Sequence, residues 1–345
     1  MADEELLPER QELYEHFRFV IEDGQSLLRI DKYLSTRMNQ ASRTRIQNAA
    51  NAGSILVNNV LVKPSYKVKP GDIVQIFLPN PPREIELIPQ NIPLNIVYED
   101  EDVLVVNKAA GMVVHPAYGN YSGTLVNALL YYFKDLPLFS SGEARPGLAH
   151  RIDKNTSGLL VVAKNENALS KLSKQFYERT TDRRYQALVW GSPNPAEGTI
   201  IVNIGRNIRN RNLRQVFEDG SEGKSAITHY KTLENLGYIT LVECKLETGR
   251  THQIRVHFSH IKHPIFNDED YGGNHILKGT TFAKYQQFVK NCFSMLPRQA
   301  LHAKSLAFNH PVTDKRLSFD SELPEDMKAV IEKWKNYTSG RELDD

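Results

Sequence analysis

One charged cluster in the sequence lies directly before a turn and a strongly apolar segment. The stretch PGLAHRIDKNTSGLLVVAK (146–164) contains His150, Arg151 and Asp153, followed by the turn-forming residues 155–158. Turn formers bend the chain, so the residues before them can be presented to a ligand at the mouth of a sheet. If this leader is extended, Arg151 and Asp153 point to the same side. The sequence therefore predicts a carboxylate and a guanidinium on one surface.

A second stretch, LETGRTHQIRVHF (246–258), supplies a partner for that carboxylate. Its alternation predicts a strand with one apolar face, formed by His252, Ile254, Val256 and Phe258, and a second face formed by Gln253, Arg255 and His257. An arginine in an otherwise apolar strand is costly unless it is paired, and we expect Asp153 to be the partner of Arg255. An opposing guanidinium favours the charged form of a carboxylate. Asp153 would then stay ionised, as a nucleophile or a general base requires.

The elements that position these residues are predicted to form an α+β domain. Several segments have the β-branched and aromatic composition of strands: 183–191, 225–233, 238–249 and 250–258. A helix is expected over 165–180, beginning at Asn165 and placing Leu169, Leu172 and Phe176 on one side. The order predicts a mixed, mainly antiparallel sheet with a central cleft over residues 93–325. A C-terminal helix or tail follows at 326–345.

The N-terminal part of the chain predicts a smaller α/β unit over residues 27–80. It contains two short helices, the second capped by Ser42, and then short strands separated by a turn at Asn58 and Asn59. A linker is expected at 81–92, because the preceding PNPPRE holds three prolines, which disfavour helix and central strand. Residues 1–26 are expected to form a polar, partly helical arm.

Charge is distributed unevenly, although the net charge of the 345 residues is only +2. Residues 1–26 hold eight acidic and two basic side chains, whereas 27–80 hold eight basic and two acidic ones. A polyanionic partner would explain Arg43 and Arg45 near the start of a helix, where the helix dipole disfavours positive charge. The basic residues that we expect to contact such a partner are Arg29, Lys32, Arg43, Arg45 and Lys63. A basic loop with Arg206, Arg209 and Arg211 is either solvated or a further contact.

Composition excludes several classes of protein. The longest apolar runs are about a quarter of the ~20 residues that a membrane span needs, so we expect no membrane association. With two cysteines and no signal-peptide pattern, a cytoplasmic protein with structural thiols is predicted. A zinc site near His252 and His257 lacks a second ligand pair. GSEGKS (220–225) lacks the first glycine of a phosphate-binding loop and precedes a strand, so we expect no nucleotide, metal or other cofactor.

The motifs carry a family resemblance. RIDKYLS, SRTRIQ, AGSILVNN and VKPSYKVKPGD resemble the alpha-L RNA-binding motif, which attaches two helices and a hairpin to an RNA backbone. HRIDKNTSGLLVVAK, RRYQALVWG, TGRTHQIRVH, HPIFNDEDYGG and RQALHAKSLAFNHP resemble, in that order, the RluA-type RNA pseudouridine synthases and their RluC/RluD branch. The sequence departs from the family at Ile152, Asn155 and Ala109, where leucine, aspartate and proline are usual, and NAANAG departs from the alpha-L motif.

The resemblance implies the roles of the site residues. Asp153 would be the essential carboxylate, Tyr185 the active-site aromatic that stacks on uracil, and Arg255 the salt-bridge partner. The implied reaction isomerises uridine to pseudouridine in structured RNA, either by attack on C1′ or by removal of the C2′ proton. The uridine must be flipped out of its stack. Arg151 can then fill the gap by stacking, while His150 contacts RNA or braces the turn.

The implied substrate is 23S-type ribosomal RNA, free or in an assembling large subunit, and the implied enzyme is a monomer. Two alternatives stay open. The protein could keep this fold as a catalytically silent RNA-binding or ribosome-assembly factor, although Asp153, Tyr185 and Arg255 are all present. A carboxylate-dependent nucleosidase or glycoside hydrolase would need a second carboxylate near Asp153, and no other motif supplies one.

Overall fold

The computed structural model of the chain describes residues 14–38, 42–78, 87–117, 120–140, 145–207, 210, 212–220 and 222–339. The chain divides into two compact units, Met1–Ile85 and Glu86–Asp345. The division falls inside the range 81–92, which the sequence predicts as a linker. Each unit is described by itself.

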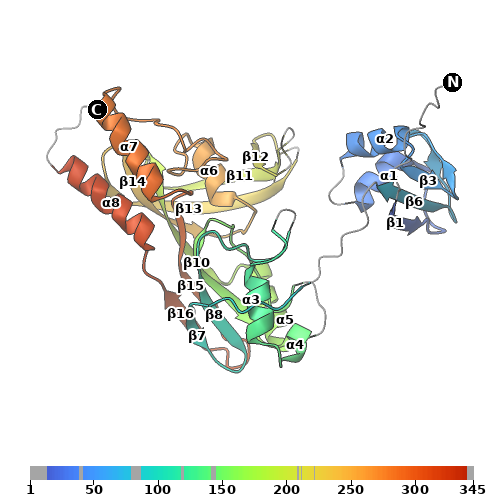
Figure 1. The fold of residues 1–345 in the computed structure, drawn as a ribbon, viewed down its shortest axis with the longest axis horizontal. Helices are drawn as coiled ribbons and strands as arrows, with labels where there is room; N and C mark the ends of the chain where they lie inside the picture. The colour runs from blue at the N-terminus through green and yellow to red at the C-terminus, as the bar shows by residue number, and fades with distance from the viewer. Residues whose placement is uncertain are drawn as a thin grey trace, which may run out of the picture. The chain divides into compact units, whose positions relative to one another are not determined.

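The smaller unit has a four-stranded antiparallel sheet, two helices and a short strand pair (Figure 1). Its elements are β1 (Tyr14–Val20), β2 (Leu28–Arg29), α1 (Ile30–Arg37), α2 (Arg43–Asn51), β3 (Ile55–Val57), β4 (Val60–Leu61), β5 (Lys67–Val68) and β6 (Ile73–Leu78). The Oγ of Ser42 accepts a hydrogen bond from the Arg45 N–H and caps α2, as predicted. Asn58 and Asn59 have φ angles of 50° and 66°, the left-handed conformation of a tight hairpin turn.

Strand β1 corrects the expectation of a partly helical arm. Tyr14–Val20 pairs with β6 from Tyr14 opposite Leu78 to Val20 opposite Ile73. The acidic composition of residues 1–26 concealed this strand, because its partner lies far along the chain. Residues 1–13 of the predicted arm lie outside the described residues.

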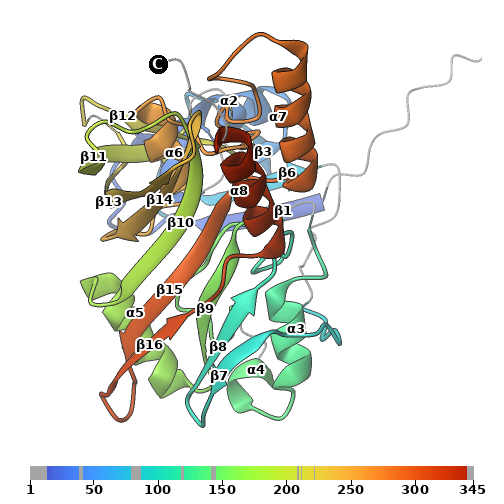
Figure 2. The same cartoon turned by 90° about the vertical axis from the view of Figure 1, so that its left-hand side faces the viewer.

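The larger unit is built on a ten-stranded sheet in the order β12-β11-β13-β14-β10-β15-β9-β8-β7, with β16 paired to β15 (Figure 2). Its strands are β7 (Ile96–Glu99), β8 (Val103–Lys108), β9 (Ser157–Ala163), β10 (Asp182–Trp190), β11 (Glu197–Arg206), β12 (Arg214–Phe217), β13 (Lys224–Asn235), β14 (Ile239–Leu246), β15 (Leu301–Asn309) and β16 (Arg316–Asp320). The β9–β15 pair is parallel and the other described pairs are antiparallel. The predicted α+β class is confirmed.

Helices cover both faces of this sheet near β8 and β9. The helices of the larger unit are α3 (Leu125–Tyr132), α4 (Pro137–Ser140), α5 (Glu166–Glu178), α6 (Gln253–His260), α7 (Ala283–Met295) and α8 (Glu325–Thr338). Alternate strand residues face opposite ways: Val105 and Val161 pack with α5, whereas Val106 and Val162 belong to the core that includes α3 and α6. Asn165 caps α5, as predicted.

Two elements differ from their predicted form or setting. Residues Gln253–His260 form helix α6, so the predicted strand over 250–258 is wrong. Gln253 to Phe258 are all buried, and a helix buried all round has no polar face that reveals its period. The predicted C-terminal segment contains α8, whose Val330 and Trp334 are fully buried in the main core of this unit.

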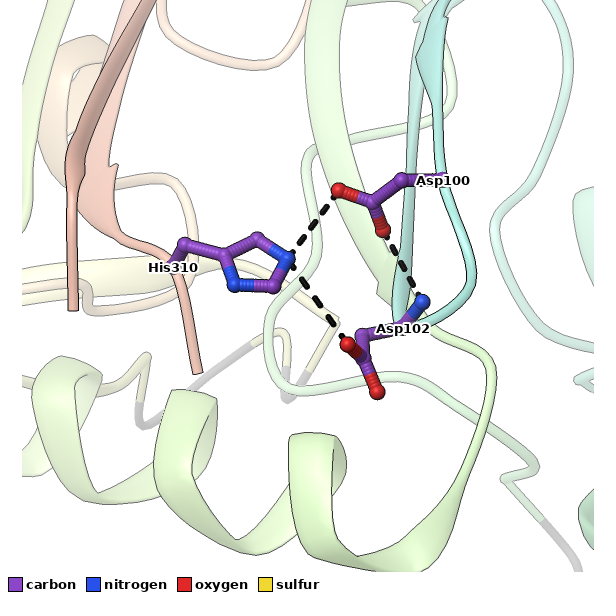
Figure 3. Close-up of side chains that lie close together, drawn as sticks. All are labelled: Asp100, Asp102 and His310. Carbon is purple, nitrogen blue, oxygen red and sulfur yellow. Dashed lines mark hydrogen bonds and ion pairs between the residues drawn. The ribbon is translucent and has the colours of Figure 1, made fainter. Parts of the chain in front are cut away.

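The β7–β8 turn is joined to the end of β15 by a small polar cluster, Asp100, Asp102 and His310 (Figure 3). Asp100 Oδ1 accepts hydrogen bonds from the backbone N–H groups of Asp102 and Val103. The His310 Nε2 lies 3.0 Å from Asp100 Oδ2 and 3.9 Å from Asp102 Oδ2. The cluster fixes the turn to the neighbouring strand.

Candidate active site

A cavity of about 490 Å³ lies beside the loop that precedes β9, and Arg151 and Asp153 line it. A second hollow, of about 620 Å³, also contains both residues. The Thr156 N–H donates a hydrogen bond to the Asp153 carbonyl oxygen at 3.1 Å and closes the turn. Ile152 is buried in the core while its two neighbours line the cavity. The alternation expected of this leader therefore agrees with the structure.

The carboxylate of Asp153 lies close to the Arg255 guanidinium, at 3.6 Å from Oδ2 to Nη1. The hydrogen bonds of Arg255 go elsewhere: Nε and Nη2 reach Asp268 at 2.8 and 2.7 Å, and Nη2 reaches Asp270 at 2.6 Å. Burial lowers the pKa of Arg255, but the hydrogen bonds and charge of Asp268 outweigh burial and raise it. The expected proximity holds, but Asp153 is a secondary partner. The signal for Asp268 and Asp270 was the acidic motif HPIFNDEDYGG, to which the sequence assigned no role.

His252 also faces Asp153, although the strand interpretation placed it opposite Arg255. In a helix, positions three apart share a face, and the His252 Nε2 lies 3.9 Å from Asp153 Oδ2. The Tyr271 Oη accepts a hydrogen bond from the Arg214 backbone N–H, so its own O–H can donate to His252 Nδ1, 2.7 Å away. Burial raises the pKa of Tyr271 to about 12, which keeps this donor protonated. The His252 proton is then on Nε2, facing Asp153.

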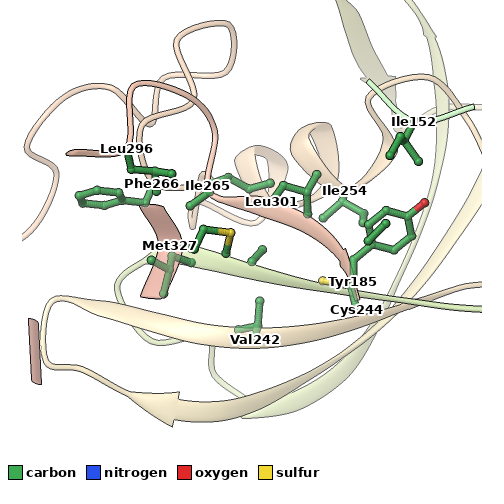
Figure 4. Packing of buried hydrophobic residues seen from close by; sticks show 14 of the residues in the cluster. Ile152, Tyr185, Val242, Cys244, Ile254, Ile265, Phe266, Leu296, Leu301 and Met327 are labelled. Atoms are coloured by element: carbon green, nitrogen blue, oxygen red, sulfur yellow. The ribbon is translucent and has the colours of Figure 1, made fainter. Parts of the chain in front are cut away.

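Tyr185 lies at the border of the cavity and the hydrophobic core. It is on β10, is 8% exposed, and belongs to the core cluster while also lining the cavity. Figure 4 shows Tyr185, Ile152 and Ile254 toward one end of the drawn cluster. Burial raises the pKa of Tyr185, the nearby Arg183 lowers it, and burial prevails. The side chain is therefore a neutral phenol whose ring can form one wall for a flat ligand.

The two residues that flank the cavity before Asp153 differ in their surroundings. Arg151 is exposed and lines both hollows. His150 stacks on Phe176 with 4.3 Å between ring centroids, and its Nε2 accepts a hydrogen bond from the Val161 N–H. Burial lowers the pKa of His150 to about 3. These contacts fit the bracing role weighed for His150 and leave Arg151 as the accessible cation.

The wall behind Asp153 is held by Lys108, which the sequence did not single out. This lysine is 2% exposed, and its Nζ donates to the carbonyl oxygens of Ala109, Met112 and Lys154. Burial lowers the pKa of Lys108 to about 7, while the charge of Asp153 acts in the opposite direction. The three hydrogen bonds tie the residue after Asp153 to the end of β8.

The basic residues of the smaller unit fall into two groups. Arg29 and Arg43 both donate to the fully buried Asp31, through Nε and Nη2 of Arg29 and Nε of Arg43. Burial would raise the pKa of Asp31, but hydrogen bonds from Arg29, Gln47 and Arg43 hold it below its usual range. The others, Lys32, Arg45 and Lys63, are exposed. Part of the predicted anion-binding charge is thus committed to an internal carboxylate that the sequence did not identify.

The basic loop of the larger unit is described only in part. Arg206 ends β11 and is exposed. Arg209 and Arg211 lie outside the described residues.

One group of described residues has ligand atoms close enough for a metal ion, all within 4.8 Å: Asp100, Asp102 and His310. The donor set does not fit. The His310 Nδ1 accepts hydrogen bonds from the N–H groups of Val312 and Thr313, so the proton of a neutral ring is on Nε2. Because that nitrogen is the one facing the two carboxylates, it has no lone pair for a metal.

Fold and site together define a class of protein: an RNA-modifying enzyme, with a carboxylate in an arginine-lined cavity and a separate basic unit of helices and strands. The RNA pseudouridylate synthase family matches residues 102–260, and the S4 domain family matches residues 28–74. A protein of Chlorobaculum parvum named as an RNA pseudouridine synthase is 47% identical over 311 residues, covering 90% of this chain and 94% of that protein. The chain belongs to the RNA pseudouridine synthase family, whose members isomerise uridine in RNA.

Two further comparisons agree. A Zymomonas mobilis protein named ribosomal large subunit pseudouridine synthase D is 44% identical over 305 residues, covering 88% of this chain and 92% of that protein. The structure of human RNA pseudouridylate synthase domain containing 1 has a TM-score of 0.51 and 28% identity, covering 72% of this chain and 89% of that chain. Within the described ranges, no helix is long and apolar enough to cross a membrane.

Proposed function

We propose that this enzyme converts uridine to pseudouridine in the RNA of the large ribosomal subunit, with Asp153 as the reacting carboxylate. The observation that carries the proposal is the state of that carboxylate. Among the described residues no hydrogen bond to its oxygens is found, because Arg255 gives its short bonds to Asp268 and Asp270. Asp153 is therefore held near a positive charge, in a cavity, with its oxygens available to a substrate.

The reaction follows from what the cavity offers. In one route an Asp153 oxygen attacks the ribose C1′, and the C1′–N1 bond breaks with its electron pair on uracil N1. In the other, Asp153 takes the C2′ proton and a glycal forms. The uracil then turns, C5 bonds to C1′, C5 loses its proton and N1 gains one. Tyr185, a neutral phenol, stacks on the ring throughout.

Access to C1′ and C5 requires the uridine to leave its stack, at a cost of a few kcal/mol. Arg151 is suited to replace it, because a planar guanidinium can stack on bases while it bonds phosphate. Lys32, Arg45 and Lys63 of the smaller unit are suited to hold the RNA backbone, with binding that weakens as salt rises. Arg29 and Arg43 contribute through donors not engaged by Asp31.

The large-subunit RNA is proposed because the compared Zymomonas protein bears that substrate in its name. We place the enzyme in the cytoplasm as a monomer, since its two cysteines are free and buried and the cavity is lined by one chain. A silent assembly factor and a nucleosidase are the alternatives. Other carboxylates that line the two hollows are paired, Asp270 with Arg255 and Glu247 with His229, which disfavours a second catalytic acid.

The test uses ribosomal RNA transcripts labelled with tritium at uridine C5. We expect the wild-type protein to release tritium and the Asp153→Asn variant to release none while it binds the RNA with nearly unchanged affinity. Free uracil among the products would instead support a nucleosidase. Binding without tritium release by the wild-type protein would support an assembly factor. Comparing pseudouridine maps of ribosomal RNA from cells with and without the protein identifies the modified positions.

A further inference from the structure

A buried arginine in the cavity wall lacks a counter-charge. Arg183 is on β10, two residues before Tyr185, and is 8% exposed. In the described part of the chain it has no hydrogen-bond acceptor and no ion-pair partner, and its Nε is buried without one. Its one recorded contact of this kind is with the Phe176 ring, whose centroid lies 5.5 Å from the guanidinium carbon.

The other buried arginines of the described residues show how unusual this is. Arg255 is paired with Asp268, and Arg298 forms two hydrogen bonds with Asp326. Arg184, the neighbour on the opposite face of β10, donates to Glu243. Removing an ion from water costs several kcal/mol unless it is paired. Arg183 therefore carries a cost that nothing found in the described chain offsets.

Arg183 is positioned to meet a ligand, because it lines the same cavity as Asp153 and Tyr185. Gly249 makes room for it: a Cβ at that position would lie 2.8 Å from Nη1. The nearby His150 does not add charge, since burial keeps it neutral. The side chains of Arg183 and Tyr185 leave the strand on the same face, about 7 Å apart along it. A nucleotide whose base stacks on Tyr185 would bring its sugar and phosphates into this region.

We propose that Arg183 binds a phosphate group of the flipped uridine nucleotide. The inference rests on the proposed function, because it takes the base to lie on Tyr185. A phosphate supplies the missing negative charge and matches the guanidinium fork, which forms two parallel hydrogen bonds to such oxygens. Arg183 would thus recognise the backbone of the reacting nucleotide itself, apart from the RNA held by Arg151 and the smaller unit.

The first test measures binding of small probes to the full-length protein by NMR titration. Uridine, uridine 5′-monophosphate and uridine 3′-monophosphate are compared in wild type, Arg183→Met and Arg183→Lys, with Arg184→Met as the matched control. We expect one monophosphate to bind wild type roughly ten- to hundredfold more tightly than uridine, the range for hydrogen bonds to a charged group. That gain should vanish in Arg183→Met, shrink in Arg183→Lys and persist in Arg184→Met. The monophosphate that shows it identifies the phosphate.

Thermal unfolding without ligand separates this role from a structural one. Methionine keeps much of the length of Arg183 and removes an uncompensated buried charge, so Arg183→Met should melt no lower than the wild type. A lower melting temperature would make Arg183 a structural residue and overturn the proposal. So would an equal phosphate gain in Arg183→Met and wild type, or no gain in the wild type. Tritium release by Asp153→Asn tests the proposed function separately and does not depend on these measurements.

Discussion

Replacing Arg255 with methionine tests the charge balance that holds the site together. Arg255 is 5% exposed and forms three hydrogen bonds of 2.8, 2.7 and 2.6 Å with Asp268 and Asp270. Methionine fills much of the same volume without charge, so it would leave the fully buried Asp268 unpaired. Breaking a buried ion pair by removing one member costs about 3–5 kcal/mol. We expect Arg255→Met to lose that much free energy of unfolding.

The Asp153→Asn variant is the matched control. Asp153 is the third carboxylate around one guanidinium and makes no hydrogen bond with it, so its removal loses an attraction to Arg255 and relieves repulsion from Asp268 and Asp270. We expect its free energy of unfolding to change by about 1 kcal/mol or less. Both variants should lose pseudouridine formation, but only Arg255→Met should lose stability.

Urea unfolding followed by circular dichroism measures the difference. For a domain of this size each kcal/mol lowers the melting temperature by about 2–4 °C, so Arg255→Met should melt roughly 6–20 °C lower. Adding Asp268→Asn to Arg255→Met removes the stranded charge and should restore part of the loss. Wild-type stability in Arg255→Met, or no recovery in the double variant, would refute the reasoning.

Three further predictions concern groups outside this ion pair. The folded-state pKa of Asp31 lies below its unfolded value, so the stability it gives is present above about pH 4 and lost as pH falls further; acid unfolding of the protein should show this loss, and Asp31→Asn should remove it. Replacing Lys32 and Arg45 with glutamine should lower the salt dependence of RNA affinity by about 0.7–0.9 per lost phosphate contact, and an unchanged slope would count against their role. Tyr271→Phe removes the donor to His252 Nδ1 and should lower kcat with little change in KM, whereas an altered KM alone would indicate a binding role.

Much of the local structure could be predicted from the sequence, because its causes are local. Ser42 and Asn165 cap helices through bonds to amides three residues away. Asn58 and Asn59 adopt the left-handed turn that their side chains tolerate. The ordered motifs also fixed the family and the fold class. Tyr14–Val20 was missed because a strand at the edge of a sheet depends on a partner that composition does not reveal.

The site itself needed the tertiary structure. From the sequence, a charged leader before a turn identified Asp153, and one arginine among apolar residues identified Arg255 as a residue that must be paired. Whether His252 faces the same carboxylate depended on helix or strand, which short buried segments do not signal. The pairing of Arg255 with Asp268, of Arg29 and Arg43 with Asp31, and the lack of any partner for Arg183 were decided by folding. Charges interact through space, and the energy of a buried charge depends on which distant groups the fold brings beside it.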